Sequence, residues 1–369
     1  MIMTRNELRQ YIAEIPAADA AAMDAAAKRQ AALAKPPGSL GRLEEISVRL
    51  AGLTGSIRNE VERCRILVFA ADNGVVAEGV SSAPQSVTLS QTVNMTRGVT
   101  GMSAMARAFG NSVRVVDVGI NAQVRCAQIL PRKVRFGTQN LAKAPALTEQ
   151  EVLQAIAVGM EQAGQAQKEG VQALGIGEMG IGNTTTSTAV LCALTGAEPE
   201  RVTGRGGGLT DEAFGKKLRV ISEALALHRP AADDPIDVLS KVGGLDLAAM
   251  AGAYLACARL RLPAVADGLI SIVAALCAVR LCPRVRDAVF LSHASYEPGY
   301  LLAAEELKLS PCLLLEMRLG EGSGCPLMFQ VMKAACAAMN TMATFSEAEI
   351  NDGYLDEIRK IDAFTVKQK

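Results

Sequence analysis

The sequence lacks tryptophan, has only two histidines and shows no excess of either charge, and each shortage narrows the possible functions. Its 369 residues include 38 Lys or Arg and 38 Asp or Glu, which gives a formal net charge of zero. A general nucleic-acid binder usually carries a basic excess, so we expect no nucleic-acid partner. With no Trp and only five Tyr, few side chains can stack on sugars.

The signals of a metal site, a disulfide framework and a membrane segment are missing as well. His228 and His293 are far apart, and none of the nine cysteines forms a C-x-x-C pair, whereas zinc sites need closely spaced ligands. An odd number of cysteines without a secretion signal is typical of reduced thiols in the cytosol. The longest uncharged run, 179–197, opens with the polar stretch MGIGNTTTST, which does not suit a membrane span. We expect a cytoplasmic protein without a metal ion or a membrane contact.

Short apolar runs alternate with helix-like segments through most of the chain. The predicted strands are 65–72, 112–119, 171–180, 262–268, 287–295 and 310–322, and helix-like segments between them include 149–169, 211–226 and 245–260. Short buried strands that alternate with helices predict an α/β fold with a mainly parallel sheet.

Both ends of the chain are predicted to be helical. Ala-rich residues 1–34 favour a helix that must stop at Pro36 and Pro37, and the segment 326–350 is helix-like again. We expect the N-terminal helices (1–50) and the C-terminal helices (326–369) to form a smaller helical domain beside an α/β core of residues 51–325.

Glycines and small polar residues gather where the predicted strands end. The stretches are ADNGVVAEGVS, DVGINA, GEMGIGNTTT, DGLIS, SHASYEPGY and RLGEGSG. Ligands of open α/β sheets bind at the C-terminal ends of the strands. The six loops therefore predict a single active-site rim.

Two glycine-rich stretches have the chemistry of an anion site. In GEMGIGNTTTSTAV, a glycine turn and a helix start bring backbone N–H groups and hydroxyls together, although capping of the helix by Asn183 or Thr184 is the simpler alternative. In VTGRGGGLTDEAFGKKL, the side chains of Arg205, Lys216 and Lys217 can add positive charge. The first strand is not followed by G-x-G-x-x-G, which argues against a dehydrogenase.

Two acids, Glu178 and Glu321, stand among glycines in these loops. Burial in a cleft can raise the pKa of such a carboxylate and make it a general base, and an exposed loop acid is the alternative. Paired acids also suggest a glycosidase, which the phosphate-like loops and the shortage of aromatic residues disfavour. His293 is either a ligand or proton shuttle, or a structural hydrogen-bonding residue.

Seven motifs, in order over roughly residues 35 to 350, resemble those of a known family. They are KPPGSLGRLEE, ADNGVVAEGVSSAPQSVT, GEMGIGNTT, GRGGGL, SHASYEPGY, RLGEGSG and MATFSEAEI. Together they resemble the nicotinate-nucleotide–dimethylbenzimidazole phosphoribosyltransferases, which activate the lower ligand of cobamides. The resemblance implies that the phosphoribosyl group of nicotinate mononucleotide passes to 5,6-dimethylbenzimidazole or a related aromatic base, giving an α-ribotide and nicotinate. It also implies a Rossmann-like core, a smaller helical domain, a dimer and no cofactor.

The resemblance also implies roles for individual residues. It makes Glu321 the catalytic base that takes a proton from the acceptor. It implies a phosphoribosyl-binding set, which consists of Glu178, Gly180, Gly182, Asn183, Thr184, Thr185, Lys217, Ser292 and Arg318. It implies an acceptor-base pocket that contains Asn73, Ala83, Gln91, Leu269, Tyr300 and Leu319.

Four of the acceptor positions depart from the family's pattern. Asn73 stands where the motif has a histidine, Ala83 where a serine often lines the pocket, Leu269 for a phenylalanine and Tyr300 for a histidine. A less polar pocket would suit a phenolic acceptor such as phenol or p-cresol, used by a variant that works with a homologous second subunit. A non-catalytic partner subunit is another alternative, which the presence of both candidate acids disfavours.

Overall fold

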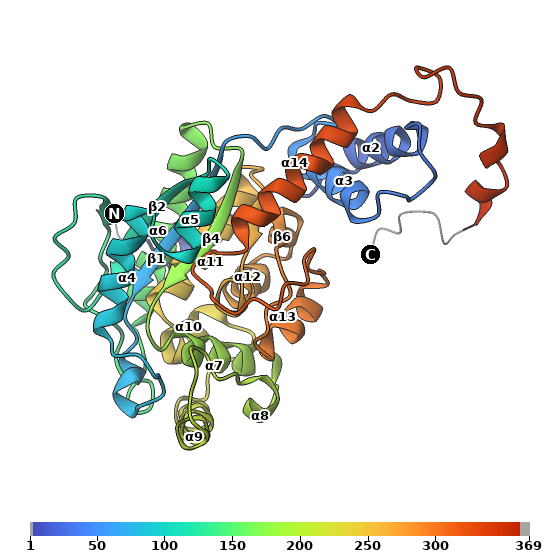
Figure 1. The fold of residues 1–369 in the computed structure, drawn as a ribbon. Helices are drawn as coiled ribbons and strands as arrows, with labels where there is room; N and C mark the ends of the chain where they lie inside the picture. The colour runs from blue at the N-terminus through green and yellow to red at the C-terminus, as the bar shows by residue number, and fades with distance from the viewer. Residues whose placement is uncertain (1–2, 362–369) are drawn as a thin grey trace.

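The computed structural model describes residues 3–361, and within them six strands form one sheet in which all neighbours are parallel (Figure 1). The strands are β1 (Cys64–Ala71), β2 (Ser112–Gly119), β3 (Ile129–Pro131), β4 (Ala173–Met179), β5 (Ala264–Ala266) and β6 (Val289–Leu291). Their order is β3-β2-β1-β4-β5-β6, which is the order of a Rossmann sheet. The predicted α/β fold with a mainly parallel sheet is confirmed.

Helices precede, connect and follow the strands. The α-helices of the described chain are α1 (Arg5–Ala13), α2 (Ala20–Ala32), α3 (Arg42–Thr54), α4 (Ser86–Arg97), α5 (Gly101–Ala108), α6 (Glu149–Lys168), α7 (Asn183–Thr195), α8 (Pro199–Val202), α9 (Asp211–His228), α10 (Pro235–Val242), α11 (Leu245–Arg259), α12 (Leu269–Leu281), α13 (Gly299–Leu307) and α14 (Cys325–Thr341). Short 3-10 helices are η1 (Gly74–Glu78), η2 (Pro283–Ala288), η3 (Gly353–Leu355) and η4 (Ile358–Lys360).

The sheet is covered on both faces, so its central strands are buried and rich in apolar residues, as expected for parallel strands. Helices α11 and α12 pack on one face, and α6 packs against α11, whereas α4, α5 and α14 cover the other face. The contact with α14 depends on a glycine, because a Cβ on Gly175 of β4 would lie 2.5 Å from the Cβ of Cys325. These two layers of helices fix the ends of the strands that carry the site.

The helices α2 and α3 lie away from the sheet, beside the C-terminal half of α14 (Figure 1). A small apolar cluster joins them and consists of Ala26, Val48, Ala51 and Met339. An isolated antiparallel bridge between Leu33 and Thr344 adds a second link. The N-terminal half of α14 rests on the sheet, so this helix connects the two parts of the molecule.

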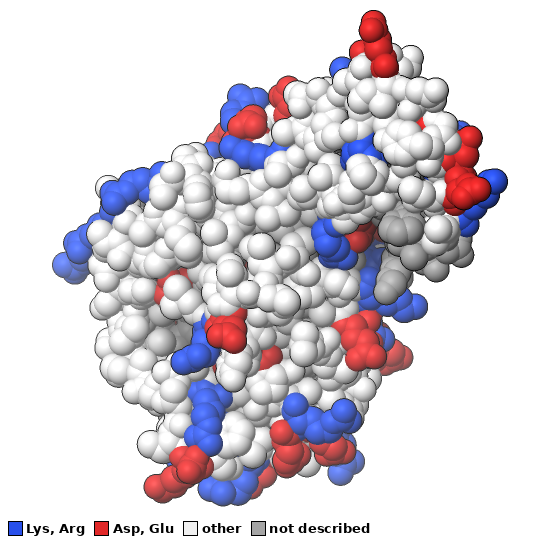
Figure 2. All heavy atoms as spheres, turned by 45° about the vertical axis from the view of Figure 1, so that its right-hand side comes forward, with Lys and Arg blue, Asp and Glu red and all other residues white. Residues whose placement is uncertain are grey.

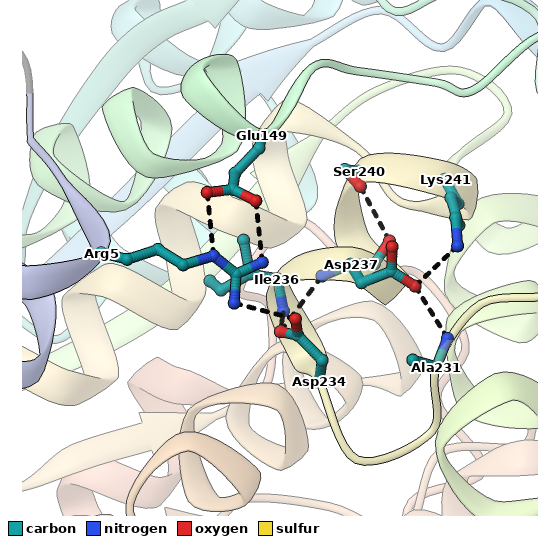
Figure 3. Close-up of polar contacts among 8 residues, drawn as sticks. All are labelled: Arg5, Glu149, Ala231, Asp234, Ile236, Asp237, Ser240 and Lys241. Atoms are coloured by element: carbon teal, nitrogen blue, oxygen red, sulfur yellow. Dashed lines mark hydrogen bonds and ion pairs between the residues drawn. The ribbon is translucent and has the colours of Figure 1, made fainter.

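The first helix, α1, is attached to the α/β part instead (Figure 3). Arg5 donates hydrogen bonds to Asp234 and Glu149, and so ties α1 to the start of α10 and of α6. The same view shows Asp237 bonded to Lys241 and to the backbone of Ala231, which holds the turn before α10. The domain boundaries at residues 50/51 and 325/326 stay a prediction.

One strand prediction was wrong, and one strand was missed. Residues 310–322 form no strand; the segment makes only an isolated parallel bridge between Leu313 and His293, and Leu314 is 84% exposed. Its apolar run has the composition of a buried strand, but Glu316 has a left-handed backbone (φ +53°), which ends any extended pairing. The short strand β3 was missed, because Pro131 reads as a strand breaker and is tolerated only at an edge.

The ends of two predicted helices also differ. The N-terminal helical stretch is interrupted between α1 and α2, and the C-terminal helix stops at Thr341 rather than continuing to residue 350. Within residues 3–361, no helix combines the length and the apolar character that crossing a membrane requires.

Candidate active site

A pocket of about 290 Å³ lies at the C-terminal edge of the sheet, where the strand order changes direction between β1 and β4. Its walls come from the segments 80–83, 178–184, 205–207, 268–270 and 318–321, and from Val87, Gln91, Leu209, Ser295 and Glu297. Five of the six predicted loops therefore meet at one pocket. The sixth, DVGINA after β2, does not line it.

Glu178 lies near the end of β4, opposite Phe69 of β1, and is 6% exposed. Its Oε1 accepts the backbone N–H of Glu321 at 3.2 Å, and its Oε2 accepts the side-chain amide of Asn183, which also donates to Asp246. Burial, together with the charge of Asp246, raises the pKa of Glu178 to about 8. At neutral pH this carboxyl group is therefore mostly protonated.

Glu321 lies in a turn of three left-handed residues, with φ of +79° at Gly320, +63° at Glu321 and +84° at Gly322. The turn rests directly on β4, because a Cβ on Gly177 would lie 2.8 Å from the carbonyl oxygen of Glu321. This contact explains why β4 carries a glycine opposite the turn. The acid reaches the pocket wall from a segment that is fixed against the sheet.

The Glu321 side chain is 7% exposed and has one free oxygen. Gln91 of α4 donates to its Oε1 at 2.9 Å, and its Oε2 has no partner among the described residues. Burial raises the pKa of Glu321, whereas the Gln91 amide opposes the rise and the charge of Asp267 adds to it. A buried carboxylate with a raised pKa and a free oxygen has the properties of a general base.

The donors of the pocket gather at the start of α7 and in the glycine-rich turn before α9. Lys217 is fully buried, and its Nζ donates to Thr184 Oγ1 at 2.9 Å and to the carbonyl oxygen of Gly204 at 3.0 Å. Burial lowers the pKa of Lys217 to about 8, and the charge of Glu297 opposes the shift. Arg205 lines the same part of the wall from an exposed position. These groups can hold an anion.

Glu297 closes this side of the pocket and was missed by the sequence prediction. Its Oε1 accepts the N–H of Gly206 at 3.1 Å, and a Cβ on Gly204 would lie 1.8 Å from its Oε2. The glycine-rich turn is thus held by Glu297 on one side and by Lys217 on the other. Glycines are required here because the backbone presses against a carboxylate.

Much of the remaining wall is apolar. Val80, Ala83, Val87, Leu269 and Leu319 line it together with the turn that carries Glu321. Leu319 is 53% exposed and lies over Gly101 of α5, whose Cβ would be 2.8 Å from it. A flat apolar molecule can bury its surface against these side chains.

The structure brings eleven of the sixteen predicted site residues to the pocket wall. They are Ala83, Gln91, Glu178, Gly180, Gly182, Asn183, Thr184, Leu269, Arg318, Leu319 and Glu321. The other five lie behind the wall and are buried; they are Asn73, Thr185, Lys217, Ser292 and Tyr300. Lys217 is one hydroxyl away from the pocket through Thr184. The other four do not line the pocket; they are Asn73, Thr185, Ser292 and Tyr300.

The sequence prediction also missed Ser295, which lines the pocket. It missed three buried acids near the site as well. Asp267 directly follows β5, Asp246 lies in the first turn of α11, and Asp72 follows β1. The acid before a glycine in ADG, directly after a short apolar run, was a usable signal for Asp267. Asp246 gave none, because an acid in the first helical turn is ordinary.

Two open alternatives are decided by local geometry. The N-cap of α7 is Gly182 (φ +92°), and no side chain caps this helix; Asn183 binds Glu178 and Asp246 instead. His293 is fully buried, bonds to Ser292 and stacks 6.5 Å from Tyr300, away from the pocket wall. Among residues 3–361, no group of three or more His, Cys, Asp or Glu could hold a metal ion.

Comparison with known proteins shows the family of the chain. Residues 15–350 match the sequence model of a family described as "Phosphoribosyltransferase". The chain is 48% identical to the nicotinate-nucleotide–dimethylbenzimidazole phosphoribosyltransferase of Clostridium perfringens over 92% of this chain and 94% of that protein, and 47% identical to the Acetivibrio thermocellus protein of the same name over 88% and 93%. The crystal structure of CobT from Thermus thermophilus is similar with a TM-score of 0.87 and 42% identity, over 90% of this chain and 100% of that one. The chain belongs to the nicotinate-nucleotide–dimethylbenzimidazole phosphoribosyltransferase family.

Proposed function

We propose that this chain transfers the phosphoribosyl group of nicotinate mononucleotide to an aromatic acceptor, 5,6-dimethylbenzimidazole or a related lower-ligand base. The products are an α-ribotide and nicotinate, and the reaction serves the assembly of the cobamide nucleotide loop. Support comes from the family, whose relatives carry this activity in their names, and from the pocket at the switch point of the sheet.

The observation that carries the proposal is the environment of Glu321. Its free Oε2 belongs to a buried carboxylate that Gln91 orients, between an apolar wall and a group of donors. The acceptor lies against the apolar wall, and Glu321 removes the proton from its ring N–H. A general base needs enough affinity for the proton that it removes. Burial increases this affinity by raising the pKa of Glu321.

The bonds of the reaction balance without a cofactor. The lone pair of the second ring nitrogen forms the new bond to C1′ of the ribose, on the face opposite nicotinate. The bond between C1′ and the pyridine nitrogen breaks, and its electron pair neutralises the pyridinium charge. The acceptor proton passes to Glu321, so the substrates need no oxidant or metal ion.

The donor side of the pocket supports the binding of the phosphoribosyl group. Thr184 and the turn 205–207 line the wall, with the Lys217 ammonium group behind Thr184. Backbone N–H groups, a hydroxyl and cations are the groups that hold phosphate. Glu178 has a pKa of about 8 and is mostly protonated at neutral pH, so it adds little negative charge that would repel the phosphate.

A phenolic acceptor is the second candidate, and the observation that favours it is the lining by Ala83 and Leu269. Ala83 forms no side-chain hydrogen bond, whereas the family's pattern often has a serine there, and Leu269 replaces a phenylalanine, which is apolar as well. A phenol has one attacking oxygen, whose proton Glu321 would remove. Asn73 and Tyr300, the other two departures, are buried behind the wall and support this candidate less.

The test is conversion of nicotinate mononucleotide by wild type and by Glu321→Gln, with benzimidazole, phenol and p-cresol as competing acceptors. We expect kcat to fall by about 10²–10⁴ in the variant, the usual contribution of a general base, with donor affinity retained in calorimetry. Glu316→Gln is the control, because Glu316 is an exposed acid in the same segment. Activity of Glu321→Gln within twofold of the control would contradict the assignment, and turnover of benzimidazole alone would rule out the phenolic candidate.

We further propose that the chain works as a dimer, with itself or with a homologous subunit, in the cytoplasm. All nine cysteines are free and seven of them are buried, which fits a reducing compartment. Several large apolar side chains of the segment between α13 and α14 are exposed, including Leu314, Leu315 and Leu319, and a partner chain would cover them.

A further inference from the structure

Asp267 is a fully buried acid that does not line the pocket but contacts the turn that carries Glu321. It directly follows β5. Its Oδ2 accepts the N–H of Gly322 at 2.9 Å, and its Oδ1 accepts the N–H of Gly324 at 2.7 Å. One carboxylate therefore binds the turn at two points, immediately after Glu321.

The turn needs such fastening because its backbone is costly. Glu321 is a non-glycine residue at φ +63°, between two glycines that are also left-handed. A left-handed conformation is unfavourable for an L-residue with a side chain, so it persists only where surrounding contacts enforce it. Glu178 accepts the N–H of Glu321 itself, and Asp267 accepts the N–H groups of Gly322 and Gly324.

The surroundings of Asp267 act on its charge in both directions: burial raises its pKa, whereas the charge of His293 and the bonds from backbone N–H groups lower it. Asp267 lies at the N-terminus of α14, a helix of 17 residues, where a negative group is stabilised by the unpaired N–H groups and by the helix dipole. His293 Nδ1 is 3.8 Å from its Oδ1. No side chain fits at Gly324, because a Cβ there would lie 2.3 Å from His293 Nδ1 and 3.0 Å from Asp267 Oδ1.

We propose that Asp267 is a positioning residue of the reaction: through its bonds to the N–H groups of Gly322 and Gly324 it fixes the turn that presents Glu321. The inference rests on the proposed function, since Asp267 acts only through Glu321. It does not line the pocket.

The charged and polar groups around Glu321, Asp267 among them, also change its pKa. Asp267 raises the pKa of Glu321 and opposes Gln91, which lowers it. The other charged or titratable groups facing the site from the packed elements are Glu178 on β4, Asp246 on α11, His293 and Glu297 after β6, and Arg205 and Arg318 in the pocket loops. Activity is lost as the pH falls through the pKa of Glu321, because the base becomes protonated. Removing the Asp267 charge must therefore move this acidic limit to lower pH.

The test compares the pH profiles of kcat for wild type, Asp267→Asn and Asp267→Glu. In Asp267→Asn, an amide N–H₂ replaces one accepting oxygen, so the turn loses a bond and the charge together. We expect kcat to fall about ten- to a hundredfold, the size of a small misplacement of a reacting group, with the acidic limit at lower pH and the donor KM within about twofold of wild type. In Asp267→Glu, which keeps the charge but displaces the carboxylate, we expect a lower kcat with the acidic limit unchanged.

Asp117→Asn is the matched control, because Asp117 is a buried carboxylate at the end of β2 that bonds to the backbone of Ile120 and to Lys133, outside the pocket wall. It should leave the acidic limit in place. Wild-type kcat in Asp267→Asn, or a lower kcat with an unmoved acidic limit, would overturn the inference while leaving Glu321→Gln inactive and the proposed function intact. If Asp267→Asn does not fold, Asp267→Glu decides, and a wild-type kcat in that variant overturns the positioning role. Full activity of Glu321→Gln would overturn both proposals.

Discussion

Lys217 shows how a single residue can be prepared for a charged ligand. Its ammonium group is fully buried behind Thr184, whereas Arg205 and Arg318, the cations of the pocket wall, are exposed. A buried ammonium group is costly without a nearby anion, which is why the pKa of Lys217 is lowered to about 8. A phosphate beside Thr184 would offset that cost, so we expect ligand binding and protonation of Lys217 to be linked.

Replacing Lys217 tests this link. Lys217→Met should weaken the binding of nicotinate mononucleotide by about 10- to 100-fold, the range of a hydrogen bond to a charged group. In wild type, affinity should fall as the pH rises through about 8, because the lowered pKa means that Lys217 loses its charge there. Isothermal titration calorimetry on both sides of that pKa measures both effects. Lys216→Met is the control, since the neighbouring side chain is exposed; equal affinities of the two variants would exclude Lys217 from donor binding.

At the scale of single residues, the sequence identified the acids that are flanked by glycines. It did not identify the buried acids that bond to the residues around them. Glu178 and Glu321 are recognisable because glycines flank them at the ends of predicted strands. Asp267 and Asp246 are defined by partners far away in the sequence, such as Gly322 for Asp267 and Asn183 for Asp246. These contacts leave no local pattern; only the place of Asp267 before a glycine, directly after an apolar run, offered a signal.

At the scale of elements, the contact between α6 and α11 is a close one, and it depends on two glycines. A Cβ on Gly159 of α6 would lie 1.8 Å from the carbonyl oxygen of Ala249, and a Cβ on Gly252 of α11 would lie 2.0 Å from that of Ile156. Both obstacles are backbone atoms, which cannot rotate away as a side chain can. The helices can therefore approach only as long as both positions lack a side chain.

This contact reverses the usual effect of a helical Gly→Ala substitution. Gly159→Ala should lower the free energy of unfolding by roughly 2 kcal/mol or more, because overpacking forces the helices apart. Gly164→Ala in the same helix α6 meets no atom within 4 Å and should raise stability by about 0.5–1 kcal/mol, the propensity difference between the two residues. Urea unfolding followed by circular dichroism measures both. Equal stability of the two variants would show that the helices can separate at little cost.

The elements were predictable where local pattern and packing agree. The strands β1, β2 and β4 and the helices α6, α9 and α11 were located within a few residues, because their apolar runs are buried by the fold. The run 313–315 has the same local character, yet Leu314 and Leu315 are exposed beside β6. The sequence of an apolar run does not by itself determine whether another segment of the same chain packs against it.

At the scale of the whole molecule, one face of the protein has few charges across its centre. Figure 2 shows that Lys, Arg, Asp and Glu side chains lie mainly along the edges of this face, while a broad area across its centre carries few. The segment between α13 and α14, orange-red in Figure 1, lies on the side that Figure 2 brings forward. Tyr296 is 67% exposed, Leu314 84%, Leu315 50% and Leu319 53%, and Tyr296 is joined to this segment by its N–H bond to the carbonyl oxygen of Met317.

These exposed side chains lead to the prediction of a dimer that buries them. A stable interface usually removes about 1,200–2,000 Å² from water, and each buried leucine contributes about 1.5–3 kcal/mol. Changing Leu314 and Leu315 together to Asp places unpaired charges in that interface, so the doubly substituted protein should sediment as a monomer at micromolar concentration while wild type sediments as a dimer. Leu227→Asp is the control, because Leu227 is 58% exposed but lies on α9, outside the segment. A monomeric wild type, or a dimer that tolerates both Asp residues, would show that this surface does not join two copies, and the homologous subunit would become the partner to test, by mixing it with this chain and repeating the sedimentation.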